Sequence, residues 1–401
     1  MANTILTNDL IGKEGMRIFY NELGFCKTTN RDYEAEFNGP VKTGTSVRVR
    51  KPAQWTPRVA SNTYSSQNML EEYNTLTINA PDGIDSTLTQ AEIDMSLDSF
   101  SNRILKTQMP RLASQVDANQ LNLAAKYAQT HVNAASTSLA YGDVVGLRAK
   151  LVEQCLPMGE TLDLFCNPTD QVQLLSDTKG LFQNANEIGG QYVNGMMGKF
   201  GGFNWRETNL LSTITPPADV AGAVDNAAFA NGTDVLAVDA LGANGEIIPA
   251  GAVITIAGVY AVNPETKQST GVLATFRVKT AATVATNAAS LTLTSKLFDS
   301  TDSRQNVSAL PADDAVVTIV GTASTAYRQN LAFHKDAWTT AFVDMELPKG
   351  VDMGSKETFE GITMRFVRDW DFDSNTWKSR WDVQYGGCPL RSEWSGILSN
   401  F

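Results

Sequence analysis

A polar block rich in Ala, Thr and Gly, at roughly residues 213–325, separates two stretches that share the pattern of one mixed α/β domain. The first stretch ends in a glycine-studded loop and a strand at 186–205, and the second resumes as Asn330-Leu-Ala-Phe-His-Lys-Asp-Ala-Trp338. Within the block, short runs of β-type residues alternate with Gly, Asn, Asp and Pro. The sequence therefore predicts a β-rich domain inserted into a mixed host domain, as a small barrel or sandwich. The predicted strands are 235–241, 252–262, 272–278, 291–297 and 316–320.

The composition is that of a folded soluble protein, with 401 residues of which 42% are hydrophobic and 19% charged. The formal net charge of −11 argues against a protein that grips duplex nucleic acid, because that function requires cations facing phosphates. The N-terminus lacks the pattern of a signal peptide, and no apolar run has the length of a membrane span. We therefore expect folding in the cytoplasm and no membrane association.

The residue types that carry enzyme chemistry are few and form no known catalytic motif. His131 is expected at the end of a long helix, where a cation suits the helix dipole, and His334 at the end of a strand. The cysteines contain no Cys-x-x-Cys pair, which indicates reduced thiols and not a zinc site or a disulfide framework. They are Cys26, Cys155, Cys166 and Cys388. We predict no catalytic residues, no metal and no cofactor.

The glycine-rich segment 189–202 could cradle a phosphate with its backbone N–H groups. However, Phe200 follows Gly198-Lys199 at the position where a Walker loop needs Ser or Thr for magnesium. A flexible contact loop is the favoured interpretation, because Met and aromatic residues are frequent at adaptable interfaces. The candidate contact residues of this loop are Tyr192, Met196, Met197 and Phe200.

The N-terminal half is predicted to contain an arm, a ribbon and a long helix. A helix capped by Thr7 begins the arm, and residues 44–97 form an extended ribbon in which cations alternate with Val47 and Val49. An isolated two-stranded ribbon is marginal in water, so it needs another surface to rest on. The cations could be solvated, or could direct the ribbon to carboxylates of another subunit. They are Arg48, Arg50, Lys51 and Arg58.

Apolar spacing predicts a helix over about 99–131, with a kink at Pro110. A helix over 143–155, a buried strand over 162–166 and a helix capped by Thr169 are predicted to follow.

Near the C-terminus, a strand at 362–366, a turn at 371–375 and an alternating strand form a predicted hairpin, which we expect to close the sheet that the insert interrupts. Its turn mimics the start of a calcium loop, but Ser374 and Arg380 replace the required Gly and Glu, so a solvated turn is favoured.

This order of parts resembles the major capsid proteins of tailed bacteriophages, which have the Hong Kong 97-type fold. The similarity is to the coat proteins of short-tailed phages that carry an insertion domain, and it covers essentially the whole chain. Its most specific stretches are 201–211, 330–337 and 364–371.

The resemblance implies an α+β fold with named parts. These are an N-terminal arm (1–43), an E-loop ribbon (44–97), a spine helix and peripheral domain (98–141), the first part of an axial domain (142–212), the inserted β-rich domain (213–325), and the second part of the axial domain with the C-terminal hairpin (326–401).

The resemblance also implies self-assembly, as hexamers and pentamers, into an icosahedral shell that encloses phage double-stranded DNA. The implied partners are a scaffolding protein, a portal protein and DNA packaged without sequence-specific contacts, and the implied location is the virion after assembly in the host cytoplasm. Two alternatives remain open, a β-rich surface or adhesion protein and a nucleotide-binding enzyme that uses the 189–202 loop.

Overall fold

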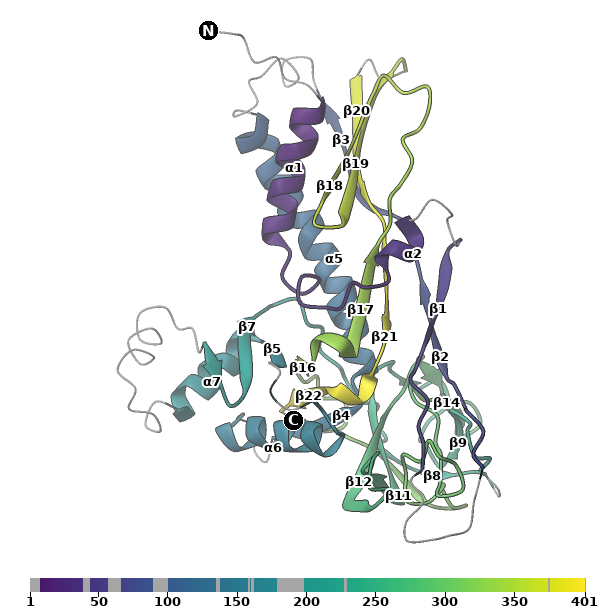
Figure 1. The fold of residues 1–401 in the computed structure, drawn as a ribbon. Coiled ribbons are helices and arrows are strands. Elements are labelled where there is room, and N and C mark those ends of the chain that lie inside the picture. The colour runs from purple at the N-terminus through teal and green to yellow at the C-terminus, as the bar shows by residue number, and fades with distance from the viewer. Residues whose placement is uncertain are drawn as a thin grey trace. The chain divides into compact units, whose positions relative to one another are not determined.

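The structure is a computed structural model of the chain, and it describes residues 8–38, 44–56, 66–88, 100–134, 138–157, 159, 162–178, 198–226, 229–373 and 376–400. The chain divides into two compact units (Figure 1). The first unit comprises residues 1–49, 73–121 and 338–390, and the second comprises 50–72, 122–337 and 391–401. Each unit is therefore assembled from segments that are distant in the sequence.

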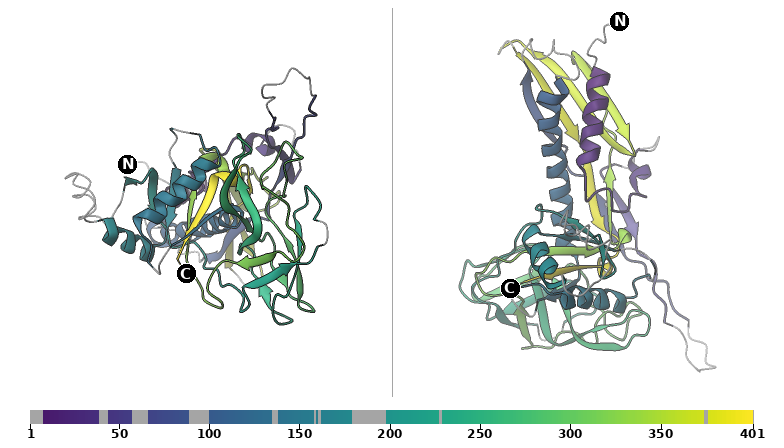
Figure 2. Two further views of the ribbon diagram at one scale, coloured as in Figure 1. Left: turned by 90° about the horizontal axis from the view of Figure 1, so that it is seen from below. Right: turned by 90° about the vertical axis from the view of Figure 1, so that its left-hand side faces the viewer.

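The first unit contains a four-stranded antiparallel sheet with one face packed on a helix. The strand order is β18 (Met353–Phe359), β19 (Ile362–Asp371), β20 (Thr376–Val383) and β3 (Asp82–Leu88). Helix α1 (Asn8–Glu22) lies along this sheet (Figures 1 and 2). Gly15 sits against the indole of Trp381, where a Cβ would lie 2.7 Å from a ring carbon. The close approach of helix and sheet therefore depends on a glycine at this position.

The predicted C-terminal hairpin is present as β19 and β20, but the prediction that it closes the interrupted sheet is wrong. Its second strand pairs with β3, which comes from the ribbon segment. Alternation along β20 shows that one face is buried, but it does not specify which sheet the strand joins. The opposite face is also partly buried, because Asp382 is inaccessible and pairs with Arg365.

The base of the ribbon is held within the first unit. Strands β1 (Ser46–Arg50) and β2 (Tyr73–Thr77) pair with each other, and Ile78 bridges to β21 (Tyr385–Pro389). Strand β21 in turn pairs with β17 (Trp338–Phe342). The buried residues that join these strands to α2 (Glu34–Asn38) are Phe37, Val49, Leu76, Ile78, Ala341 and Cys388. The ribbon therefore starts from a packed base.

The predicted long helix is a π-helical turn, η1 (Ser101–Leu105), followed by α5 (Lys106–Tyr127). Pro110 cannot donate an N–H to the residue one turn earlier, and its ring crowds that carbonyl. The widened turn lies just before this position, as expected where a proline interrupts the regular ladder. The helix ends at Tyr127, so the placement of His131 at its end is wrong. His131 lies in strand β4 (Thr130–Asn133) and is buried.

The host sheet of the second unit has six strands. Their order is β4, β22 (Ser395–Ser399), β16 (Gln329–Phe333), β5 (Leu162–Cys166), β7 (Phe203–Glu207) and β6 (Lys199–Phe200). Strand β16 is central and buried along its length, which explains its continuous apolar pattern. Helices α6 (Tyr141–Glu153) and α7 (Pro168–Thr178) belong to the same unit.

Helix α7 is tied to the central strand by buried polar side chains. The cap of this helix is Asn167, whose Oδ1 accepts the Thr169 N–H at 3.1 Å, so the prediction that Thr169 is the cap is wrong by two residues. The Asn330 amide donates to Asp170 at 2.8 Å and accepts the Asn167 N–H at 2.7 Å. Arg328 completes the set with an Nε–Oδ1 distance of 2.8 Å to Asp170. These bonds satisfy a carboxylate that is inaccessible to solvent.

The predicted insert is a closed antiparallel β-barrel. Its sheet order is β12 (Ser269–Arg277), β11 (Val253–Val262), β15 (Val316–Ile319), β8 (Ala221–Val224), β9 (Val235–Asp239) and β14 (Ala288–Thr292). The two end strands continue into each other, because Val278 bridges Leu293 and the Lys279 N–H donates to the Thr292 carbonyl at 2.7 Å. The strands predicted at 235–241, 252–262, 272–278 and 316–320 are confirmed, the run at 291–297 forms a strand only at Leu291 and Thr292, and β8 was missed. Because the sheet closes on itself, the structure is the barrel and not the sandwich of the two predicted alternatives.

The barrel has an apolar core of its own, drawn from every strand of the ring. Its inaccessible members include Val224, Leu236, Val238, Ile254, Ile256, Leu291 and Val317. Where the chain enters and leaves the barrel, Ile214 and Tyr327 exchange two backbone hydrogen bonds of 3.1 and 2.9 Å.

Candidate assembly surface

The ribbon carries three of the four predicted contact cations on one arm, and each has a partner within the chain. The Arg48 guanidinium lies over the Tyr73 ring, 4.8 Å from its centroid. Arg50 pairs with Glu71 at 3.3 Å and Lys51 with Glu72 at 4.0 Å. Arg50 nevertheless remains largely exposed, with 76% of its side chain accessible. The cations therefore belong to a ribbon whose charge is largely balanced locally, which sequence reasoning did not anticipate.

The two arms of the ribbon remain paired beyond strands β1 and β2. The Lys51 N–H donates to the Glu72 carbonyl at 2.7 Å. Further out, the Gln67 amide donates to the Thr56 carbonyl at 2.6 Å and accepts the Thr56 N–H at 3.0 Å. Arg58 lies outside the described residues, so its predicted contact stays a prediction.

Large apolar side chains on the ribbon are exposed, and they were not among the contact residues predicted from the sequence. They are Trp55 at 54%, Met69 at 59%, Leu70 at 40% and Tyr73 at 55%. An isolated exposed apolar residue is ordinary, but several on one narrow ribbon mark an interaction site. One feature of the sequence could have indicated this site. Large apolar residues occur there in a polar, proline-containing stretch that has neither a helical nor a strand periodicity.

Of the predicted contact residues in the glycine-rich loop, only Phe200 falls within the described part of the chain. Its ring is 8% exposed and packs against Tyr141, with ring centroids 4.8 Å apart. The Trp205 indole N–H donates to its carbonyl at 3.0 Å. Phe200 is therefore used inside its own subunit, and we exclude it from the contact surface. Tyr192, Met196 and Met197 lie outside the described residues.

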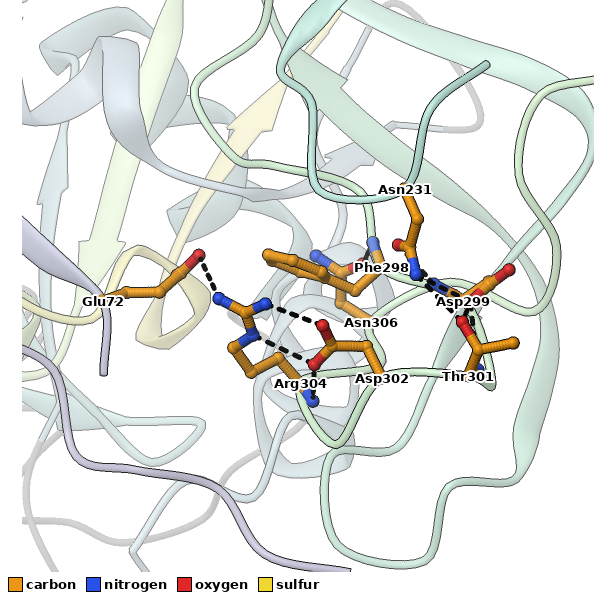
Figure 3. Close-up of polar contacts among 8 residues, drawn as sticks. All are labelled: Glu72, Asn231, Phe298, Asp299, Thr301, Asp302, Arg304 and Asn306. Carbon is orange, nitrogen blue, oxygen red and sulfur yellow. Dashed lines mark hydrogen bonds and ion pairs between the residues drawn. The ribbon is translucent and has the colours of Figure 1, made fainter. Parts of the chain in front are cut away.

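The barrel presents an arginine to the ribbon. Arg304 binds Asp302 through two nitrogens, with Nη2–Oδ2 and Nε–Oδ1 distances of 2.7 and 3.0 Å, and reaches Glu72 with Nη1 at 3.5 Å (Figure 3). Hydrogen bonding to Arg304 lowers the pKa of Asp302, and the same bond raises the pKa of Arg304. No sequence motif predicts this cluster, and its one local indication is the spacing of Asp302 and Arg304 in a turn.

The buried histidines serve packing and hydrogen bonding. His131 Nε2 lies 2.6 Å from the Ser399 hydroxyl, and burial holds its pKa well below the ordinary value, so the ring is neutral. His334 follows strand β16, accepts the Asp336 N–H at 3.2 Å and meets the Trp394 ring edge-on. The prediction for His334 at a strand end is confirmed.

None of the four cysteines, which all lie within the described residues, forms a disulfide bond. Burial raises the pKa of Cys26 and Cys166 well above the ordinary value and also raises that of Cys155. A raised pKa withholds the thiolate that nucleophilic or metal chemistry needs. Within the described ranges, no group of three or more His, Cys, Asp or Glu side chains is arranged to hold a metal ion.

None of the helices in the described residues combines the length and the apolar character that crossing a membrane requires.

A family match covers nearly the whole chain. The family described as P22 coat protein - gene protein 5 matches residues 9–398. The protein is accordingly a major capsid protein of the tailed-phage type, whose copies form a virion shell, and its α+β fold is of the Hong Kong 97 type. The chain belongs to the P22 coat protein family. No curated protein sequence matches the chain.

Several solved structures are similar to the chain over most of its length at low sequence identity. A structure from Mycobacterium phage Che8 is 13% identical, with 94% of this chain and 90% of that chain covered and a TM-score of 0.48. The capsid of Cyanophage P-SCSP1u is 12% identical, with coverages of 90% and 85% and a TM-score of 0.45. The mature capsid of bacteriophage PhiM1 is 10% identical, with coverages of 92% and 87% and a TM-score of 0.43.

Proposed function

We propose that copies of this chain assemble as hexamers and pentamers into an icosahedral shell around phage double-stranded DNA, with a scaffolding protein and a portal protein as partners. Assembly takes place in the host cytoplasm, and the chain has no catalytic activity. The ribbon, together with the N-terminal arm, reaches a neighbouring subunit. The proposed domain limits are those that the resemblance implies, with residues 213–325 as the inserted domain.

The observation that carries this proposal is the exposure of Trp55, Met69 and Leu70 on the ribbon, whose base is packed. Leaving these side chains in water forfeits ~1.5–3 kcal/mol for each one that could be fully buried. A neighbouring copy can cover them, and many such contacts add through multivalency in a lattice. The net charge of −11 supports a container that does not bind its DNA tightly.

The absence of catalysis is supported by the state of the titratable groups. The thiols of Cys26 and Cys166 are protonated, and His131 is neutral and buried, so none is poised as a nucleophile or base.

The test replaces two exposed ribbon residues together, as Trp55→Ser with Met69→Ser. Because both side chains are exposed in the free subunit, its melting temperature should stay nearly unchanged. The protein concentration needed to form shells with the scaffolding protein should rise at least roughly tenfold. Sedimentation and negative-stain microscopy measure the outcome.

The matched control is Ile247→Ser, which removes a 59% exposed apolar side chain from the barrel instead of the ribbon. Shell formation by the control should resemble that of the wild type. If the ribbon variant also assembles normally, the proposed role of the ribbon is wrong.

A further inference from the structure

The barrel loop at residues 298–307 is rigidly built, although it makes no strand. Asn231 donates to both Asp299 and Thr301 at 3.0 Å, and the Thr301 N–H donates to Asp299 at 3.0 Å. At the other end of the loop, the Phe298 N–H donates to Asn306 at 2.9 Å. Figure 3 shows Asp299 and Thr301 gathered around Asn231, and Phe298 beside Asn306. The loop therefore has a defined shape before anything binds to it.

The same loop fixes the direction of Arg304. Its guanidinium stacks on the Phe298 ring, 4.1 Å from the centroid, while Asp302 holds its Nε and Nη2 edge. These contacts leave Nη1 as the nitrogen that reaches Glu72 of the ribbon arm (Figure 3). A side chain held from two sides loses little further entropy when it forms another contact. Arg304 is thus preorganised toward the ribbon.

A second contact joins the barrel to the other ribbon arm. Lys267 Nζ lies 3.4 Å from Gln54 Oε1 and 3.4 Å from the Gln305 carbonyl, so it links the ribbon to the barrel loop. The two arms are joined by the hydrogen bond from the Lys51 N–H to the Glu72 carbonyl. The barrel therefore contacts both arms, at Glu72 and at Gln54.

We propose that loop 298–307 of the inserted barrel is a docking surface for the ribbon of the same chain, and that it positions the ribbon in the free subunit for a neighbouring copy. We call the Arg304–Glu72 and Lys267–Gln54 contacts the clasp. The docking itself is independent of shell formation, whereas its use in presenting the ribbon to a neighbour rests on the proposed function.

The strength of the clasp suits a reversible contact. Both of its links are long, at 3.5 and 3.4 Å, and their cations remain partly exposed. The Arg304–Glu72 link is a partly exposed ion pair, which stabilises a structure only weakly and is screened by salt, and the Lys267–Gln54 link is a hydrogen bond to a neutral amide. The ribbon can therefore adjust when a neighbour binds.

Apolar side chains of the ribbon stay exposed when the clasp is formed. Met69 is 59% and Leu70 40% exposed. Glu71, the neighbour of Glu72, pairs with Arg50 instead of the barrel. The clasp therefore leaves apolar surface of the ribbon open to a second copy.

Hydrogen–deuterium exchange of the full-length free subunit tests the docking. Peptides covering 50–56 and 66–72 should exchange roughly two- to fivefold faster in Glu72→Gln and in Arg304→Gln, the effect expected for loss of a partly exposed ion pair. The double variant should exchange no faster than Glu72→Gln, because Glu72→Gln alone already removes the contact with Arg304, together with the 4.0 Å pair to Lys51. About 1 M salt should reproduce the effect in the wild type.

The matched control is Glu71→Gln, which removes the same charge one residue away from an ion pair that does not reach the barrel. Because Arg50 lies in peptide 50–56 but is 76% exposed, this variant should accelerate exchange of that peptide clearly less than Glu72→Gln does. Arg304→Lys should restore slow exchange only in part, since lysine cannot form the two-nitrogen contact with Asp302. Circular dichroism confirms that each variant is folded.

Unchanged exchange of both peptides in Glu72→Gln and Arg304→Gln would overturn the docking, whether or not the wild type forms shells. Equal acceleration by Glu71→Gln would overturn it as well, because the effect would then reflect ribbon charge alone. Slower shell formation by Arg304→Gln, at unchanged melting temperature, is expected if docking presents the ribbon. Failure of the wild type to form any shell would contradict the proposed function and leave the exchange result intact.

Discussion

The carboxylate of Asp117 in α5 accepts the backbone N–H of Cys26 at 3.1 Å, across 91 residues of sequence. It also accepts the N–H groups of Gly24 and Phe25, so one buried side chain satisfies three donors of the turn that follows α1. A turn with buried donors and no regular partner is costly unless such an acceptor is present. Asp117 thus fixes where the N-terminal arm meets the long helix.

We expect Asp117→Ala to lower the free energy of unfolding by about 2–4 kcal/mol, because three N–H groups, two of them buried and one half-buried, lose their acceptor. Chemical denaturation followed by circular dichroism measures the change. Asp85→Ala, at an exposed carboxylate 3.5 Å from Arg380, is the control and should cost less than about 0.5 kcal/mol. Equal effects of the two substitutions would contradict the role of Asp117.

The neutral state of His131 predicts a loss of stability on mild acidification. Burial, with Arg277 and Lys150 nearby, holds its folded pKa well below the ordinary value of 6.5. Below about pH 6.5 the unfolded chain therefore binds a proton that the folded chain does not, and stability falls as pH falls. The slope should approach ~1.4 kcal/mol per pH unit.

Denaturation curves between about pH 7.5 and 5.5 measure this slope. Carboxylates with a lowered pKa, such as Glu14, become protonated only at lower pH and do not contribute to the slope in this range. His131→Gln keeps a hydrogen-bonding group near Ser399 and should flatten the dependence. A slope that persists in this variant would assign the proton uptake to another group.

The base of the ribbon depends on a close backbone approach. A Cβ at Gly386 would collide with the carbonyl oxygen of Thr77, beside the bridge between Ile78 and Gly386. We expect Gly386→Ala to destabilise the first unit by more than about 2 kcal/mol and to speed hydrogen exchange in β2. As a control, Gly146→Ala in α6 meets no atom within 4 Å and should stabilise by ~0.5–1 kcal/mol.

The closed barrel should fold when separated from its host. Residues 213–325 contain the complete ring of strands and its apolar core, so the excised segment should unfold cooperatively on heating. Leu291→Ala, at a fully buried core position, should lower its stability by about 2–5 kcal/mol. Non-cooperative unfolding of the excised segment, monitored by near-UV circular dichroism, would show that the host sheet is required.

Local patterns predicted most of the elements. The apolar run 162–166 is a buried strand, and the β-branched runs of the insert are strands of the barrel. Strand β8 was missed because its sequence, Ala-Gly-Ala-Val, has a β-branched residue only at its end. The hairpin of β19 and β20 was found, but its sheet was not, since pairing with β3 depends on residues distant in sequence.

The candidate surface was predictable only in part. The alternation of cations with Val47 and Val49 predicted the ribbon. It could not predict the pairing of Arg50 with Glu71, because these residues lie on different ribbon arms. His131 was misplaced because the pattern around it does not reveal that α5 stops at Tyr127. The contact of Arg304 with Glu72 joins the barrel to the ribbon, and no sequence period encodes such a distant pair.

The hydrogen bonds between Ile214 and Tyr327 bring the start and the end of the barrel segment side by side. The host sheet therefore accommodates the whole barrel as it would a short loop between two neighbouring positions. Mutations can accumulate in the barrel, or foreign peptides can be grafted into its outward turns, without changing the spacing of the strands that frame it.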